Sequence, residues 1–313
     1  MSSSAVAVSD HRRFIDDCLR DPAHFGDAFR PLSPECHTVQ FSRPHDDGQM
    51  QAIGALFQGR PDVRLYVYGG VRDLEFLRYF PDLRSLQLAV WDIEDISGFR
   101  HLSDEFHSLI FPKTRARFSL RFLERLAGLR DLFLQGHTRD VAVVSTLVRL
   151  DSLGLHGVGL TDLKPLLPLQ GLRTLRLGFG RIGDLSGLAA LPALETLRLM
   201  RITELADVDV LADLTALRAM DLDWLAKVTR LPDLSRLTWL EDLRLDTMKA
   251  LTDIAGAARA PSLRRLRVGA TPGLTAESFR AFVGHPALRE LHAYTGRARD
   301  NEAVLRMFPG VAR

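Results

Sequence analysis

The sequence predicts an α/β repeat fold in which parallel strands form one face and short helices form the other. One observation is the segment LDSLGLHGVGLTDLKPLLPL (150–169), whose apolar residues recur at spacings of 3, 2, 3, 2, 3, 3 and 3. Neither a helix, with a period of 3.6, nor a lone strand, with a period of 2, gives this rhythm. The other two observations are the repetition of this segment along the chain and the helical patterns at both ends.

The segment is one copy of a repeat. Related copies begin at 83, 106, 129, 150, 172, 194, 217, 240, 263 and 288, and a degenerate copy, VRLYVYGG, covers 63–70. The period is 21 to 25 residues over about ten to eleven copies, which is typical of a solenoid.

Each part of the rhythm predicts an element. The period-2 part predicts a short strand, and stacked copies place these strands about 4.8 Å apart in a parallel sheet. The later spacings of 3 predict a turn of 3₁₀ helix. Asp95, Asp162, Asp184 and Asp253 precede these turns, where a carboxylate accepts backbone N–H bonds, so we expect helix caps rather than catalytic acids.

The copies resemble the leucine-rich repeat family, whose pattern is L-x-x-L-x-L-x-x-N-x-L. The segments IEDISGF, LTDLKPL, IGDLSGL and LTDIAGA are similar to the short repeats, of roughly 22 residues, of internalins and of phosphatase-regulatory leucine-rich repeat proteins. The resemblance covers residues 62–308 and implies a right-handed, curved solenoid with its sheet on the concave face and its helices on the convex face.

This chain departs from the family at the ninth position, which is usually Asn. Here the position holds Trp91, Thr114, His137, Val158, Gly180, Ile202, Leu225, Met248, Thr271 and Gly296. In this chain we expect the backbone groups that Asn would bond to be satisfied by water, by Thr or by a turn of different shape.

A solenoid needs covers at its ends because each copy buries its leucines only against its neighbours. SDHRRFIDDCLRDP and DDGQMQAIGALFQGRP each predict a helix, so we expect an N-terminal helical cap at 1–61. The repeats then span 62–296, and the helix of RDNEAVLRMFPG gives a C-terminal cap at 297–313.

Composition narrows the function classes. The formal charge is +2 and acids alternate with bases, which argues against a nucleic-acid binder. Cys18 and Cys36 are expected to be buried reduced thiols, the alternative being one disulfide. With neither a membrane span nor a signal peptide in view, we expect a cytoplasmic protein, and the Arg-rich composition favours a bacterial source; an exported effector is the alternative.

The candidate binding surface is the concave face, where outward strand residues form rows. Its N-terminal half is apolar and aromatic, and its C-terminal half is charged. We expect apolar anchors at Tyr66, Tyr68 and Phe133; partners for acidic groups at Arg176, Arg198, Arg244 and Arg267; partners for basic groups at Asp221, Asp223 and Asp246; and further contacts at His156, His292 and Tyr294.

Other interpretations of these residues stay open. The charged row could be a cross-strand ladder that only neutralises itself, or the same ladder used to recognise a ligand. A metal site at Asp221, Asp223, Asp242 and Asp246 is disfavoured by the arginines among them. Trp91 and Trp224 are expected to pack on turns, and Trp239 between copies.

We therefore expect a protein- or peptide-recognition module without cofactor or metal, since the sequence holds no recognised catalytic motif. The alternatives are an enzyme or enzyme subunit acting on a peptide held in the groove, as in bacterial peptide modification, and an effector that binds a host protein.

Overall fold

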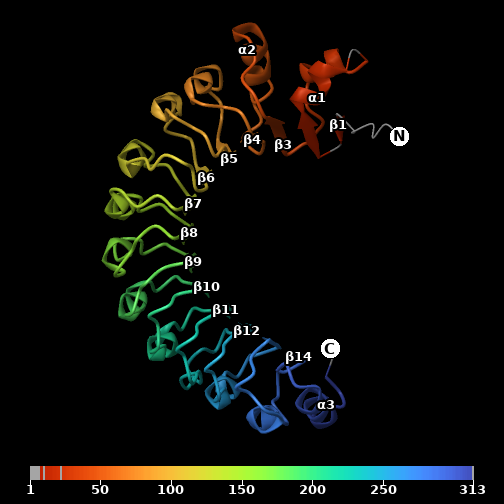
Figure 1. The fold of residues 1–313 in the computed structure, drawn as a ribbon, viewed down its shortest axis with the longest axis vertical. Coiled ribbons are helices and arrows are strands. Elements are labelled where there is room, and N and C mark those ends of the chain that lie inside the picture. Colours follow the sequence, from red (N-terminus) through yellow and green to blue (C-terminus); the bar gives the residue numbers. More distant parts are fainter. Residues whose placement is uncertain (1–7, 10, 22, 312–313) are drawn as a thin grey trace. The chain divides into compact units, whose positions relative to one another are not determined.

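The computed structural model describes residues 8–9, 11–21 and 23–311 and divides into two compact units, Met1–Arg149 and Leu150–Arg313. In each unit the copies add strands to a parallel sheet, and short helices lie on one side of these strands (Figure 1). The predicted leucine-rich repeat architecture is confirmed within each unit.

In the first unit, β1 pairs with β2 in antiparallel fashion, and the strands from β2 to β7 are parallel and adjacent in chain order. Their bounds are β1 Val8–Ser9, β2 Arg12–Phe14, β3 Thr38–Phe41, β4 Arg64–Tyr68, β5 Ser85–Ala89, β6 Ser108–Phe111 and β7 Asp131–Gln135.

In the second unit, β8 to β14 are parallel, adjacent and paired without slippage. Their bounds are β8 Ser152–His156, β9 Thr174–Gly178, β10 Thr196–Met200, β11 Ala219–Asp223, β12 Asp242–Asp246, β13 Arg265–Gly269 and β14 Glu290–Ala293.

Most of the connecting segments contain a 3₁₀ helix, as the spacing of 3 predicts. These are η1 Phe25–Ala28, η2 Glu75–Tyr79, η3 Ser97–His101, η4 Leu120–Arg125, η5 Val141–Thr146, η6 Lys164–Leu166, η7 Ser186–Ala190, η8 Asp209–Asp213, η9 Ala255–Arg259 and η10 Ala276–Phe282. The α-helices are α1 Ile15–Arg20, α2 Asp47–Ala55 and α3 Ala298–Met307.

The repeated leucines form the core. Leu153, Leu163, Leu166 and Leu169 of the copy at 150–169 are at most 3% exposed, and the equivalents of Leu153 in other copies, such as Leu86, Leu175 and Leu243, are buried too. Fully burying one such side chain contributes about 2 kcal/mol. The strands therefore alternate between leucines that point into the core and polar residues that point to solvent.

Aspartate caps begin many of the short helices, as predicted. The carboxylates of Asp95, Asp162, Asp184 and Asp253 each accept the backbone N–H two residues later, at 2.7–2.9 Å. Asp73, Asp207 and Asp233 make the same bond, although the sequence pattern did not single them out. These carboxylates are structural because each is used by the backbone of its own turn.

The ninth position is mostly buried. Val158, Ile202, Leu225 and Met248 are at most 3% exposed. His137 and Thr271 are buried too, but they bond to backbone: His137 Nε2 lies 3.0 Å from the Pro112 carbonyl oxygen, and Thr271 Oγ1 donates to that of Gly269.

The turn that replaces the asparagine is built at the eighth position. Phe179, Arg201, Trp224, Thr247 and Ala270 all have φ between 43° and 55°, the left-handed region that is rare for non-glycine residues. In the first four, the N–H donates to the last carbonyl of the next strand, as in Phe179 to Met200 at 2.9 Å. Backbone atoms thus join neighbouring copies where the family pattern has an asparagine side chain, which agrees with the expected change in the shape of the turn.

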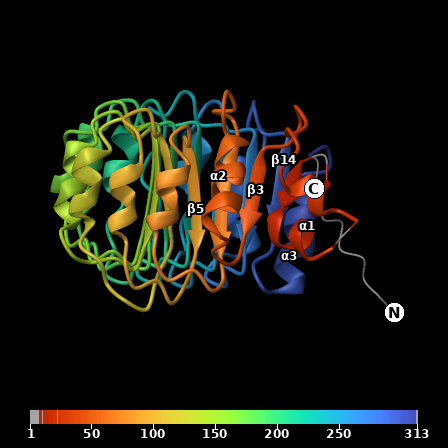
Figure 2. The ribbon, with the colours of Figure 1, turned by 90° about the horizontal axis from the view of Figure 1, so that it is seen from above.

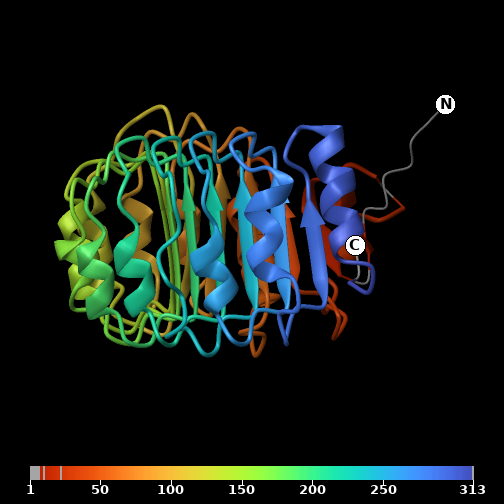
Figure 3. The same ribbon diagram turned by 90° about the horizontal axis from the view of Figure 1, so that it is seen from below.

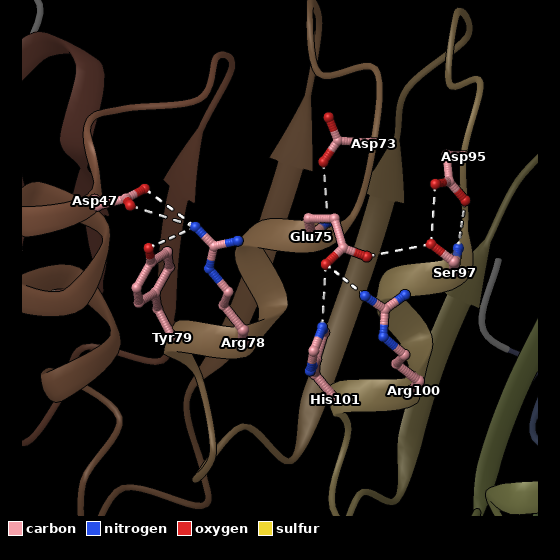
Figure 4. A network of polar contacts seen from close by, with 9 residues as sticks. All are labelled: Asp47, Asp73, Glu75, Arg78, Tyr79, Asp95, Ser97, Arg100 and His101. Atoms are coloured by element: carbon pink, nitrogen blue, oxygen red, sulfur yellow. Dashed lines mark hydrogen bonds and ion pairs between the residues drawn. The ribbon is translucent and has the colours of Figure 1, made fainter.

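Polar contacts join the helices of the first unit on the side away from the strands (Figure 4). The Glu75 carboxylate accepts from Arg100 at 2.8 Å and from Ser97 at 3.2 Å, and it lies 3.3 Å from His101 Nε2. The contact with His101, together with those of Ser97 and Arg100, lowers the pKa of Glu75 below its usual value. Arg78, close by, reaches Asp47 of α2.

Glycines let successive copies approach closely on this side. A Cβ at Gly98 would lie 1.9 Å from the Leu74 carbonyl oxygen of the preceding copy, and one at Gly256 would lie 2.1 Å from that of Pro232. No other residue type fits there without a shift of backbone.

The ends of the chain differ partly from the expected helical caps. α2 packs against η2 in the first unit (Figure 2), and α3 packs against η10 and β14 in the second (Figure 3). In SDHRRFIDDCLRDP, however, Arg12–Phe14 form strand β2, and β3 pairs in register with β4. The sheet therefore begins before residue 62, and the cap boundary at 61 stays a prediction.

Candidate functional site

The strand face, meaning the solvent side of the strands opposite the short helices, carries the candidate residues of the second unit. Alternation along each strand turns the third, fifth and seventh positions of every copy toward solvent. The register aligns them in rows, so that Arg176, Arg198, Asp221, Arg244, Arg267 and His292 form the fifth-position row.

The predicted ladder is present in this row. Asp221 Oδ2 lies 3.3 Å from Arg198 Nε and 3.8 Å from Arg244 Nη1. Arg244 also donates to Asp246 at 2.8 Å, within its own strand. Cross-strand charge pairs of this kind contribute about 0.2–1 kcal/mol each. Their larger effect is to hold the guanidinium groups in fixed positions.

A second cluster continues the face toward β14. Asp242 accepts from Arg265 at 3.1 Å and from Arg267 at 2.8 Å. Glu290 lies 3.9 Å from Arg267 Nε and 2.9 Å from His292 Nε2. His292, proposed from the sequence as a contact residue, thus belongs to the same charged surface.

A hollow of about 250 Å³ opens on this face over the small side chains of Thr196 and Ala219. Its charged lining consists of Arg176, Arg198, Asp221, Asp242, Arg244 and Arg267. Positive side chains exceed negative ones by two. The structure thus brings together the four arginines that the sequence predicts as contacts, together with Asp242, which was not expected among them.

The aspartates on the face are in different electrostatic environments. Burial raises the pKa of Asp221 above its usual 3.8, although Arg198 and Arg244 act in the opposite direction. Burial also raises the pKa of Asp223, and Asp246 and Asp221 add to this. For Asp246, burial acts upward, but the bonds from Arg244 and Thr247 prevail and lower its pKa.

These carboxylates do not make a cation site. Arginines lie between them, and within the described part of the chain no group of three or more His, Cys, Asp or Glu residues could hold a metal ion.

His156 packs against the neighbouring copy. Its ring lies over Gly178 of β9, where a Cβ would come within 2.9 Å of it, and it meets Phe179 edge-on with the ring centres 5.5 Å apart. Burial, with Arg198 and Arg176 adding to the effect, lowers the pKa of His156 below its usual value. A neutral, packed imidazole is therefore expected at neutral pH.

A strand-end ladder of Phe179, Arg201 and Trp224 borders the strand face. The Arg201 guanidinium lies 5.5 Å from the ring centre of Phe179 and 4.1 Å from that of Trp224. Phe179 is 43% exposed and Trp224 is 41% exposed. Phe179 and Arg201 were not predicted as contacts because they lie outside the odd positions of the repeat; the eighth position, followed across copies, reveals them.

Other aromatic predictions had mixed outcomes. Trp239, expected to pack between copies, is instead 56% exposed with Arg218 over its ring at 5.1 Å, so that prediction was wrong. Trp91 lies on a turn of the first unit but is 49% exposed. Tyr294 is 61% exposed at the end of β14.

In the first unit, the aromatic candidates lie on the strand face. Tyr66 and Tyr68 of β4 stack with their ring centres 5.3 Å apart. Register places Tyr66 in one row with Gln87, Ile110 and Phe133. These residues form a half-exposed apolar surface in that unit.

One cluster has the residue types of a catalytic triad but not the arrangement. The Asp16 carboxylate accepts the N–H and hydroxyl of Ser42 at 2.6 and 2.7 Å, and it lies 3.1 Å from His45 Nε2. Serine and histidine thus converge on one acid, whereas a triad needs the histidine between the other two. The hydrogen bonds of His45 and Ser42 outweigh burial and lower the pKa of Asp16.

The cysteines are also placed in the first unit. Cys18 and Cys36 are both free and buried. Burial raises the pKa of the Cys18 thiol to about 11, so little of it is the reactive thiolate at neutral pH.

Comparisons with known proteins show the fold. No family model and no curated protein matches the chain. Among solved structures, an internalin, InlF, of Listeria monocytogenes is similar, with a TM-score of 0.61, 20% identity, and coverage of 82% of this chain and 74% of that one. The functional domain of InlJ from the same organism has a TM-score of 0.50 at 16% identity, covering 83% of this chain and 58% of that one. At these identities the likeness shows a leucine-rich repeat fold.

None of the described helices has both the length and the apolar character needed to cross a bilayer.

Proposed function

We propose that this protein recognises another protein, or a peptide segment of one, through the strand face of its second unit. The observation that supports this most directly is the hollow over Thr196 and Ala219, around which the charged rows are held by mutual ion pairs. In a ladder that only neutralises itself every arginine would have a carboxylate partner, whereas Arg176 of this lining has, among the described residues, a long contact with Ser152 Oγ.

The strand-end ladder adds a second kind of contact. Trp and Arg are enriched among the residues that dominate binding energy at interfaces. Trp224 and Arg201 stack in fixed positions, which reduces the entropy lost when a partner binds. We propose that this ladder and the charged face contact the same partner.

The mixed charge of the face favours a protein over a nucleic acid. Asp221, Asp223, Asp242 and Asp246 lie among the arginines and would repel a phosphate backbone. In the first unit, Tyr66, Tyr68 and Phe133 provide a separate apolar surface, which we propose as a contact of its own. The cytoplasmic setting and the bacterial source expected from the sequence are part of this proposal.

A matched charge-reversal experiment tests the proposal. R198E/R244E changes the strand face, and R236E/R259E makes the same change in charge on the helix side, where both arginines also have carboxylate partners. Wild type and both variants are coupled to beads, and proteins captured from a lysate of the source organism are purified and tested for direct binding. We expect a partner that binds wild type and R236E/R259E but not R198E/R244E.

Binding to all three proteins alike would contradict the proposal. Because two new glutamates beside Asp221 could disturb folding, R198Q/R244Q serves as a milder variant. Its thermal melting curve shows that it is folded before its binding is judged.

A further inference from the structure

The hollow on the strand face is more selective than the charged surface around it. Thr196 and Ala219 have short side chains in the third-position row, and the longer side chains of Arg198, Asp221 and Asp242 line the hollow beside them. The hollow has a volume of about 250 Å³ and is open to solvent, so a side chain of a partner can enter it.

The lining sets the sign of the charge on that side chain. Arg176, Arg198, Arg244 and Arg267 face the hollow, against Asp221 and Asp242. Arg176 donates only a long bond, 3.4 Å, to Ser152 Oγ, which leaves its charge weakly compensated by that contact. Arg244 and Arg267 also have carboxylate partners outside the lining, Asp246 and Glu290, so Arg176 is the arginine of the lining that attracts an anion most directly.

The arginines are already oriented for binding. Arg198 is held by Asp221, Arg244 by Asp246, and Arg267 by Asp242. A guanidinium held in this way loses little further rotational freedom when it binds a carboxylate through paired N–H bonds. Arg198 Nε lies near Asp221 but makes no hydrogen bond among the described residues, so this buried donor is unused.

The candidate anions are a carboxylate and a phosphoryl group, which carries about −1.5 to −2 charges at neutral pH. A doubled charge doubles both the repulsion by Asp221 and Asp242 and the attraction to the arginines, so charge alone does not separate the two groups. Asp and Glu side chains are present in a protein that carries no modification, so the carboxylate is the group that we assign and test first.

We infer that this hollow binds the side-chain carboxylate of an Asp or Glu in the partner protein. The inference rests on the proposed function and names the chemical group that the strand face recognises.

A peptide library supplies ligands for the hollow while the natural partner is still unidentified. Random twelve-residue peptides are selected on wild type and counter-selected on R198E/R244E. We expect the enriched peptides to share an acidic residue at one position, and its replacement by Gln or Asn to weaken binding at least about tenfold, the scale of one hydrogen bond to a charged group.

Synthetic versions of one enriched peptide separate the sources of negative charge. If amidating the C-terminus weakens binding while Glu→Gln has no effect, the group is the terminal carboxylate and the side-chain assignment is overturned. Tighter binding with phosphoserine in place of the acidic residue overturns the carboxylate assignment in favour of a phosphoryl group.

Filling the hollow tests the location without changing charge. A219L extends a side chain into the hollow, and A258L makes the same substitution on a half-buried residue of η9, on the helix side. We expect A219L to weaken the peptide at least about tenfold and A258L to leave it unchanged, with both proteins melting like wild type. Equal binding by both variants overturns the inference.

The two proposals fail in distinguishable ways. Some peptides could bind wild type but not R198E/R244E and still bind after every acidic residue is replaced. That result would contradict the inference about the carboxylate but not the proposed function. A library in which no enriched peptide distinguishes these two proteins contradicts the proposed function itself.

Discussion

The guanidinium of Arg201 lies 4.1 Å from the ring centre of Trp224, although the two residues are on turns of successive copies. Both have a left-handed backbone, with φ of 52° and 54°. Left-handed conformations cost an L-residue roughly 1–2 kcal/mol, and at bulky side chains they are rare. Two large, exposed side chains thus occupy positions where glycine would be less strained, which indicates a use on the surface.

Replacing Trp224 tests that use. We expect W224A to weaken a peptide selected on the strand face by about tenfold or more, as for an interface hot spot. The free energy of unfolding should fall by only about 0.5–1 kcal/mol, because the cation–π contact is exposed. Titration and urea denaturation measure the two effects. W239A is the control, since Trp239 also stacks with an arginine but lies outside the ladder; equal losses of affinity would contradict the assignment.

Backbone strain at the eighth position predicts an unusual glycine effect. Ala270 is exposed with φ of 43°, so A270G relieves strain of about 1–2 kcal/mol and costs about 0.4–1 kcal/mol in unfolded-state entropy. We expect the variant to be more stable by about 0.5 kcal/mol in urea denaturation. A258G, inside a short helix, should instead cost about 0.5–1 kcal/mol. Destabilisation by A270G as large as by A258G would show that the turn is unstrained.

Two carboxylates on the strand face should respond to pH with opposite signs. The pKa of Asp221 is raised in the folded state, so ionised Asp221 opposes folding, and this penalty disappears as pH falls through the raised pKa toward 3.8. The pKa of Asp246 is lowered, so its stabilisation is complete above 3.8 and is lost as pH falls through its folded pKa.

Melting temperatures at about pH 7 and about pH 3 check these signs. At neutral pH we expect D221N to melt above wild type and D246N below it, and both gaps should narrow at the acidic pH. Shifts of D221N and D246N in the same direction would contradict the environments assigned to them.

The buried Asp16 contacts predict a large stability effect in the first unit. Its carboxylate accepts two bonds from Ser42, and D16N weakens them, which should cost about 1.5–3 kcal/mol in chemical denaturation. D17N is the matched control, because Asp17 is partly exposed and only 3.6 Å from Arg20; it should change stability by less than about 1 kcal/mol. Since the pKa of Asp16 is lowered, the D16N deficit should shrink as pH falls below 3.8.

Close packing at Gly98 predicts that a single methyl group is costly. G98A forces a Cβ onto the Leu74 carbonyl, and overpacking of this kind costs about 1–3 kcal/mol. At Gly171 an added Cβ has nothing within 4 Å, so G171A should be neutral or slightly stabilising. Equal urea midpoints for G98A and G171A would show that the backbone of neighbouring copies shifts easily to make room for the added methyl group.

The fold could be predicted because the leucine spacing records which side chains are buried. The same spacing placed Arg198, Asp221 and Arg244 on one row, since register follows from the period. It did not predict strand β2, because too few residues alternate there to outweigh the helical pattern of Ile15–Arg20.

The sequence did not predict the hollow or the strand-end ladder, and the reason is different. The hollow depends on how the long side chains of Arg198, Asp221, Asp242 and Arg244 lie around Thr196 and Ala219, and the period does not give side-chain conformations. Phe179 and Arg201 meet because the backbone is left-handed at both residues, and the residue types at the eighth position do not predict that conformation.

The backbone hydrogen bond between copies at the eighth position has an evolutionary consequence. Because main-chain atoms make the bond between copies, from Phe179 to Met200 and from Arg201 to Asp223, the side chain there is not needed to hold the turn. Unequal recombination that removes one whole copy, such as 194–216, would leave this backbone bond at each remaining junction and would bring Phe179 beside Trp224. Gain or loss of a whole copy would thus change which exposed side chains are neighbours in a single genetic event, and the protein would remain folded.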